Sequence, residues 1–378
     1  MQNRFSYLYK FAFYLAAFNP LLINITKFYI FDSRFVDLFF QIPLYAIIYF
    51  LFFINRMNVK VLLFIYIFTF SIFLITAYRF GYFQGVLFIK NYVSILLLMS
   101  VAERYSGAIR KSIPCVAIVY ALFGITEYFS YFYFPSFKYW VYDIASIDAW
   151  TWRPFGLHLN IHTSGALLAL AFAYGALVDK KVLMLVAALG LLFTGVKLWF
   201  VYFAVVALVA LFQKDFKIRY VLYALPFIIP VLYYVIGNYI ISEFSFSSHG
   251  SNRMKDHLYR YFEIVFTQWL PYGNIPETYT HGYNLLDIPF LFTDSEVSLF
   301  RLGFQFGTIF VLLYIYIIFV YKPKQGIKFT RSNLFTWASA IMFLHTSQIT
   351  YVAVAMVIFA IKYFPETLEN EQSFKPAG

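Results

Sequence analysis

The feature that constrains this chain most is a succession of apolar runs, each close to the ~20 residues that an α-helix needs to cross ~30 Å of hydrocarbon. Hydrophobic residues make up 62% and charged residues 12% of the sequence, whereas a soluble domain has roughly 45–50% apolar and about 25% charged residues. So much apolar surface cannot be hidden inside a water-facing globule. The sequence therefore predicts an all-α, polytopic membrane bundle that forms one integral membrane domain over residues 1–378. Single crossings are expected at about 5–26, 36–54, 59–78, 82–101, 112–134, 160–178, 218–241 and 298–321.

Two further runs are too long for one crossing. Residues 182–212 and 333–361 would form rods of roughly 46 Å and about 43 Å at a rise of ~1.5 Å per residue. Basic residues flank each run at both ends, so each is expected to leave and return on the same side as a helical hairpin. The turns are expected at Thr194-Gly195 and at His345–Gln348. This scheme gives about 12 crossings with both termini in the cytoplasm.

Lysine and arginine set the expected orientation. About 18 of them fall on the side assigned to the cytoplasm and about 8 on the other, in keeping with the positive-inside rule. The formal net charge of +11 does not indicate nucleic-acid binding, because the basic residues are dispersed between apolar segments and form no basic face. The N-terminal run lacks a small-residue cleavage site, so it is expected to stay as a signal-anchor helix.

Two segments on the expected outer side are long: a first outer loop at 135–159 and a second at 242–297. The second contains apolar residues at helical spacing, which predicts an amphipathic helix lying on the membrane surface. Those residues are Met254, Leu258, Phe262, Val265 and Trp269.

Cations on the outer side are the first candidates for a binding site. Arg153 and Arg253 belong to the two outer segments, and Lys197 follows the expected turn of the first hairpin. Each alone reads as a solvated or snorkelling residue. Together they favour a shared anionic ligand at the membrane surface, such as a lipid diphosphate, which a guanidinium binds bidentately. Arg301 is placed near the same surface, where an interfacial anchor is the default.

Carboxylates and histidines supply candidate proton-transfer groups. Asp294 and Glu296 stand directly before an expected membrane helix, where they are either ordinary helix-start residues or a general base, with His281 upstream. His158, Asn160 and His162 lie at the start of the run that begins near residue 160 and are expected to line the outer mouth of the protein. No HExxH pattern or third ligand accompanies the histidines, so no metal site and no cofactor is expected.

Lys90 and Glu127 are ionisable residues within expected spans. At membrane depth such a residue costs about 2.5–3.5 kcal/mol on insertion scales. They are interpreted either as a buried structural pair or as part of the path of a carrier.

A family resemblance rests on the order of four segments. WRPFGLHLNIHTSGALLALAF leads from an outer loop into a helix, and LLFTGVKLWFVYFAVVALVALF follows. A long outer loop then opens with SNRMKDHLYRYFE and closes with TDSEVSLFRLGFQFGTIFVLLY. Over roughly residues 150–322 the chain resembles the bacterial O-antigen polymerase and O-antigen ligase family. Arg153, Gly156 and Asn160 approximate a motif of that family, whereas Val196-Lys197 stands where members commonly have Ser-Arg.

The resemblance implies a metal-independent, inverting glycosyltransferase of the C type in the bacterial inner membrane, with its active site facing the periplasm. Its substrate would be an oligosaccharide linked to undecaprenyl diphosphate, transferred as a block onto a lipid-linked repeat unit, with a chain-length regulator and a flippase as possible partners. The cations would stabilise the diphosphate leaving group, and Asp294 or Glu296 would be the base. His281 or His162 is held in reserve for that role.

Two other functions remain open from the sequence. The ligases carry a His-Asn pair where this chain has Asp294-Ser295, which favours polymerase over ligase. A lipid-linked oligosaccharide flippase or other transporter is the alternative outside enzymes, and such carriers commonly show internal repeats that this sequence lacks.

Overall fold

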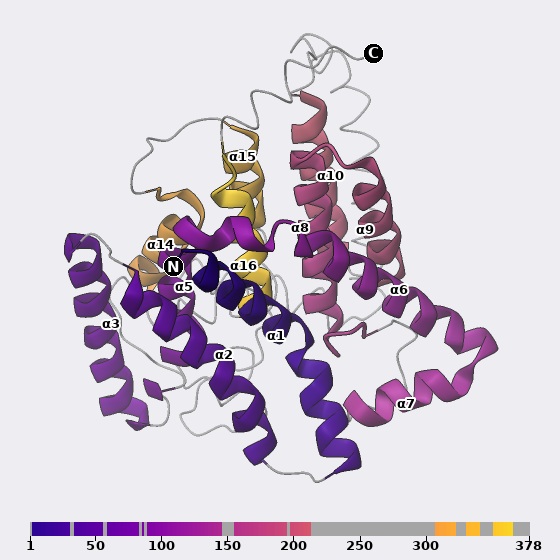
Figure 1. Ribbon diagram of the computed structural model, residues 1–378, viewed down its shortest axis with the longest axis horizontal. Helices are drawn as coiled ribbons and strands as arrows, with labels where there is room; N and C mark the ends of the chain where they lie inside the picture. The colour runs from indigo at the N-terminus through magenta and orange to yellow at the C-terminus, as the bar shows by residue number, and fades with distance from the viewer. Residues whose placement is uncertain are drawn as a thin grey trace, which may run out of the picture.

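The computed structural model describes residues 2–30, 34–55, 59–82, 85–86, 89–145, 155–194, 197–212, 307–322, 330–340 and 351–365. Within these ranges every regular element is helical (Figure 1). The first half contains α1 (Gln2–Tyr29), α2 (Arg34–Ile54), α3 (Val59–Phe80), the π-helix η1 (Ile89–Val93), α5 (Ser94–Tyr105), the 3-10 helix η2 (Ser106–Ile109), α6 (Ser112–Tyr133) and α7 (Pro135–Ala145). The second half contains α8 (Ile161–Leu177), α9 (Lys181–Thr194), α10 (Lys197–Phe212), α14 (Thr308–Ile315), the π-helix η4 (Tyr316–Val320), α15 (Arg331–Ala338) and α16 (Val352–Lys362).

Three of these helices are long and apolar enough to cross a membrane. They cover Arg4–Tyr29, Phe35–Ile54 and Ser112–Ser130, and each coincides with an expected crossing. The all-helical, membrane-type architecture predicted from the apolar runs is therefore present in the described residues. The expected crossing at 218–241 and the long segment 242–297 lie outside them.

Two expectations differ in detail from the structure, and a third is confirmed. The crossing expected at 82–101 is not one α-helix, because α3 ends before Gly81, whose φ is +90°, and the π-helix η1 precedes α5. The first outer segment is not simply a loop, because α7 forms within it. The first hairpin does break where predicted, since α9 ends at Thr194 and α10 begins at Lys197.

Helices α8 and α16 lie in the middle of the core, to which residues of α1, α5 and α6 also belong. Every residue of α16 is buried, and so are the residues of α8 from Thr163 to Leu177. A helix that is apolar on all sides belongs in the middle of a bundle. The peripheral helices α2 and α3 instead expose large apolar side chains, including Phe39, Phe53 and Phe70, which suits contact with lipid tails.

Tyrosine hydroxyls join neighbouring helices across the core. Tyr120 donates to the Ala17 carbonyl at 2.5 Å, and Tyr314 donates to the Tyr92 carbonyl at 3.2 Å. Tyr202 shares a 3.0 Å hydrogen bond with Ser339. These three tyrosines therefore serve helix packing, because hydrocarbon offers no water to a buried hydroxyl.

Lys362, at the end of α16, is buried, and its ammonium group contacts η4 and α5. Its Nζ donates to the carbonyls of Ile317 at 2.8 Å and Ile318 at 2.6 Å and lies 3.5 Å from Met99 Sδ. The carbonyls at the C-terminal end of a helix carry partial negative charge, so they offset the cost of burying the ammonium. These bonds tie the end of α16 to η4.

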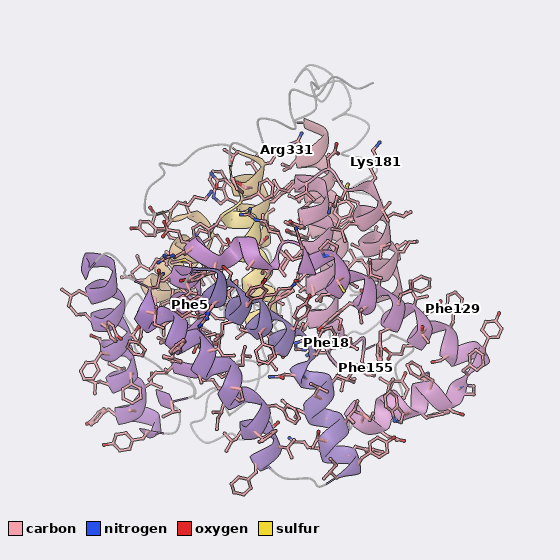
Figure 2. All side chains as sticks on the ribbon, in the orientation of Figure 1. Phe5, Phe18, Phe129, Phe155, Lys181 and Arg331 are labelled. Atoms are coloured by element: carbon pink, nitrogen blue, oxygen red, sulfur yellow. The ribbon has the colours of Figure 1, made fainter. Side chains whose placement is uncertain are left out.

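The bundle has two ends that can be told apart in Figure 2. Lys181 and Arg331 lie near the top of the bundle in Figure 2, whereas Phe155 lies in its lower half. We call the lower end, which carries residues 155–160, the loop end. The positive-inside rule assigns the loop end to the side away from the cytoplasm, and this assignment stays a prediction.

The orientation can be tested by cysteine labelling. In a background with Cys115→Ala, Ser136→Cys in α7 and Lys181→Cys in α9 each introduce one thiol at an exposed position. We expect a membrane-impermeant maleimide to label position 136 in intact spheroplasts and to label position 181 only after permeabilisation. Labelling of position 181 before permeabilisation would reverse the assigned sides.

Candidate functional site at the loop end of the bundle

The residues that lead into α8 form a tight, well-tethered loop. Residues 156–159 make a turn closed by a 2.9 Å hydrogen bond from the Leu159 amide to the Gly156 carbonyl. Asn160 then caps α8, because its Oδ1 accepts from the amides of His162 at 3.0 Å and Thr163 at 3.1 Å. The helix cap uses the side-chain oxygen of Asn160. The side-chain NH2 group is a hydrogen-bond donor, which is the kind of group that an anion binds.

Glu127 of α6 holds the start of this loop. Its Oε1 accepts from the Phe155 amide at 2.7 Å and its Oε2 accepts from the Gly156 amide at 2.8 Å. The side chain is only 2% exposed. Charge-assisted hydrogen bonds of this kind are about twice as strong as neutral ones, so they compensate for placing a carboxylate in a buried site. Of the two interpretations of Glu127, a structural role agrees with these contacts, but the partners are backbone amides rather than Lys90.

Ser164 provides a second tether at the same place. Its hydroxyl donates to the Phe155 carbonyl at 3.1 Å and accepts from the His158 amide at 3.4 Å. Gly156 has a φ of +71°, and a Cβ added there would lie 2.5 Å from Ser164 Oγ. Both the torsion and the lack of space therefore require glycine at position 156.

Helix α7 covers the loop from the other side. Val141, Tyr142, Ile144, Phe155 and Leu159 form a small apolar cluster separate from the main core. Lys138 is also buried here, with its Nζ 5.0 Å from the centre of the Tyr142 ring. Burial lowers the pKa of the Lys138 ammonium, and the nearby Glu127 carboxylate opposes that shift.

His158 packs inside the protein at this end. It is 4% exposed, and its ring meets that of Tyr351 edge to face with 5.0 Å between centroids. Burial lowers the pKa of His158 from 6.5 to about 4, so the imidazole is neutral at physiological pH. In this conformation it joins the loop to the residue that precedes α16.

Three helices begin together at the loop end. Trp199 packs on Gly165, because a Cβ added to Gly165 would lie 2.3 Å from Trp199 Cδ1, which sets the first turns of α8 and α10 side by side. The His158–Tyr351 contact brings the start of α16 to the same end. Each helix start carries roughly half a positive charge. Helix starts of this kind can bind an anion, although α9 ends directly before α10 and brings the opposite partial charge to the same end.

The predicted site residues divide into two groups. His158, Asn160 and His162 are described and lie together around the start of α8, and Lys197 is the first residue of the adjacent α10. The other predicted residues lie outside the described ranges, so their roles stay predictions: Arg153, Arg253, His281, Asp294, Glu296 and Arg301.

Neither a protein-family model nor a curated protein nor a solved structure matches this chain. The functional argument therefore rests on the residues themselves. Among those that the structure describes, no three His, Cys, Asp or Glu side chains come together as a metal site would require. What these residues do provide is the start of several helices, a rigid loop and a nearby lysine position.

The close packing of α8 on α10 predicts a clear effect of Gly165→Ala. The added methyl group would meet the Trp199 ring, and overpacking of this kind costs about 1–3 kcal/mol. We expect a lower melting temperature for the detergent-purified protein. Gly124→Ala in α6 is the matched control, because nothing lies within 4 Å of a Cβ at that position, and alanine is the better helix former. Equal melting temperatures for both variants would contradict the packing argument.

The buried imidazole predicts a pH effect on stability. Between pH 6.5 and about 4 the unfolded chain binds a proton at His158 that the folded protein does not, so stability falls as the pH drops through that window. At pH 5 the loss amounts to about 2 kcal/mol. His158→Phe removes this term. We expect the melting temperature of the variant to fall less than that of the wild type between pH 7.5 and pH 5, whereas parallel profiles would show that His158 does not contribute.

Proposed function

We propose that this protein is a membrane glycosyltransferase that polymerises lipid-linked polysaccharide repeat units, with undecaprenyl diphosphate as the leaving group. The observation that carries the proposal is the convergence of the starts of α8, α10 and α16 at one end of the bundle. A lipid diphosphate at the membrane surface is the anion that such an end of a membrane protein would meet.

Several features add to the electropositive helix starts. Lys197 opens α10, next to the turns of α8 that follow the Phe155–Asn160 loop. Arg153 stands two residues before that loop in the sequence. The Asn160 amide group adds a donor at the same place. A diphosphate bound there would meet helix dipoles that the packing of α8, α10 and α16 sets before the substrate arrives, which is the arrangement that stabilises charge most effectively.

The proposed reaction needs charge stabilisation on one side and a base on the other. The acceptor hydroxyl attacks the anomeric carbon of the donor sugar, the bond to the diphosphate oxygen breaks, and undecaprenyl diphosphate leaves with the electron pair. Asp294 or Glu296 accepts the proton of the hydroxyl. Inversion, independence of metal and the periplasmic location of the site follow from the family resemblance and belong to the proposal.

A specific observation weighs against the carrier interpretation. Glu127 was one of two ionisable residues that suggested a path through the membrane. Both of its oxygens are engaged with the backbone of the loop before α8, so this carboxylate is better suited to holding structure than to binding a moving substrate.

The proposal predicts loss of polymerisation when the cations are removed. With purified protein in liposomes and a lipid-linked repeat unit as the only substrate, we expect the wild type to produce polymer. Lys197→Ala and Arg253→Ala should reduce the rate by about 10²-fold or more, the effect typical of removing one donor to a developing anion. The rate is measured from the ladder of products on a gel.

The control is Lys181→Ala, which removes an exposed lysine from the opposite end of the bundle and should leave the rate unchanged. Full-length polymer from both cation variants would overturn the assigned site. Transport of the lipid-linked unit by the wild type without any sugar transfer would instead support a flippase.

A further inference from the structure

The buried carboxylate of Glu127 binds two backbone amides of the loop before α8. It lies in α6, while the two amides that it binds belong to Phe155 and Gly156, at distances of 2.7 and 2.8 Å. At 2% exposure the carboxylate does not face a substrate. Its effect on a ligand must therefore pass through the loop that it holds.

The amides of Phe155 and Gly156 each need a hydrogen-bond acceptor, and the two acceptors must lie in one plane. A carboxylate supplies them with one oxygen for each N–H group. The amide of glutamine would supply one oxygen and would turn its NH2 group toward the second N–H, so one donor would face another. Aspartate keeps both oxygens but is shorter by one methylene. Position 127 therefore favours glutamate, whose carboxylate has two acceptor oxygens and a side chain long enough to reach both amides.

The loop has a reason to need this tether. Gly156 has a φ of +71° and Leu159 a φ of +51°, and the second value is uncommon for a residue with a side chain. A backbone in sparsely populated torsions persists only where its surroundings hold it. Glu127 holds the first residues of the turn and the Asn160 cap holds its end.

Other contacts keep the segment packed without the carboxylate. The Phe155 ring meets Tyr142 edge to face with 5.3 Å between centroids, and Ser164 bonds the Phe155 carbonyl at 3.1 Å. Loss of the carboxylate is therefore expected to let the backbone at Phe155 and Gly156 adopt other conformations, without unfolding α6, α7 or α8. A change in ligand binding without a collapse of the fold follows from this.

We propose that Glu127 is a positioning residue, which fixes the backbone at Phe155 and Gly156 and so sets the loop before α8 in the orientation that binds the diphosphate. This inference rests on the proposed function. It adds that a residue in the wall of the bundle, remote from the reacting atoms, controls affinity for the donor lipid.

The test measures binding and loop exchange separately. The full-length protein is purified in detergent, and affinity is measured with undecaprenyl diphosphate that carries no glycan. We expect Glu127→Gln to weaken binding by about tenfold or more, which corresponds to about 1.4 kcal/mol, and to speed hydrogen exchange at the Phe155 and Gly156 amides while the melting temperature changes little. Glu127→Asp should restore part of the affinity. Glu103→Gln, at an exposed acid of α5, is the matched control and should behave as wild type.

The outcomes separate this inference from the proposed function. If the wild type neither binds undecaprenyl diphosphate nor transfers sugar, the proposed function fails, and the exchange data still report on the tether. If the wild type binds and Glu127→Gln binds equally well, the positioning role is overturned. Should Glu127→Gln not accumulate, Glu127→Asp decides: intermediate affinity with a normal melting temperature supports the role, and wild-type affinity contradicts it.

Discussion

Hydrocarbon offers no hydrogen-bonding partner, so a polar group within this bundle gains stability when the protein itself supplies one. That constraint accounts for contacts which otherwise look unrelated. Tyrosine hydroxyls bond to the backbone of neighbouring helices, and Lys362 binds carbonyls at the end of η4. The Glu127 carboxylate binds two amides of the loop before α8. Each contact joins segments far apart in the sequence, so satisfying the polar groups also fixes how the helices sit together.

The sequence predicted the helices better than it predicted their partners. The boundaries of α1, α2, α6 and α8 follow apolar runs. A helix that is buried or faces lipid along its whole length needs consecutive apolar residues, and these are visible in the sequence. The break after Thr194 was readable for the same reason, as a polar and glycine-containing point in an apolar run. In α7, apolar residues at helical spacing were present in Phe137, Val141 and Ile144, so a helix within the first outer segment could have been expected.

The partners of Glu127 could not have been foreseen. Nearly every residue carries a backbone N–H group, so the residue types at positions 155 and 156 do not indicate that their N–H groups donate to a distant carboxylate. The role of tyrosine was missed for a related reason: composition reports how many aromatic residues exist but not which of them are buried. Of the candidate site, the residues around the start of α8 lie together because they are close in the sequence, and their role stays a prediction. The meeting of three helix starts depends instead on packing at Gly165 and Tyr351.

The requirement at Gly156 has a consequence for how this protein can change over evolutionary time. Most positions in the apolar cluster around Phe155 tolerate exchange for another hydrophobic residue of similar volume. Position 156 has no acceptable substitute for glycine, since its torsion and the adjacent Ser164 hydroxyl exclude any side chain. A lineage that lost this glycine would need a different backbone course into α8 and a different residue at 164 in the same step. The loop that leads into α8 therefore cannot change by single substitutions at position 156, although the surfaces around it remain free to vary.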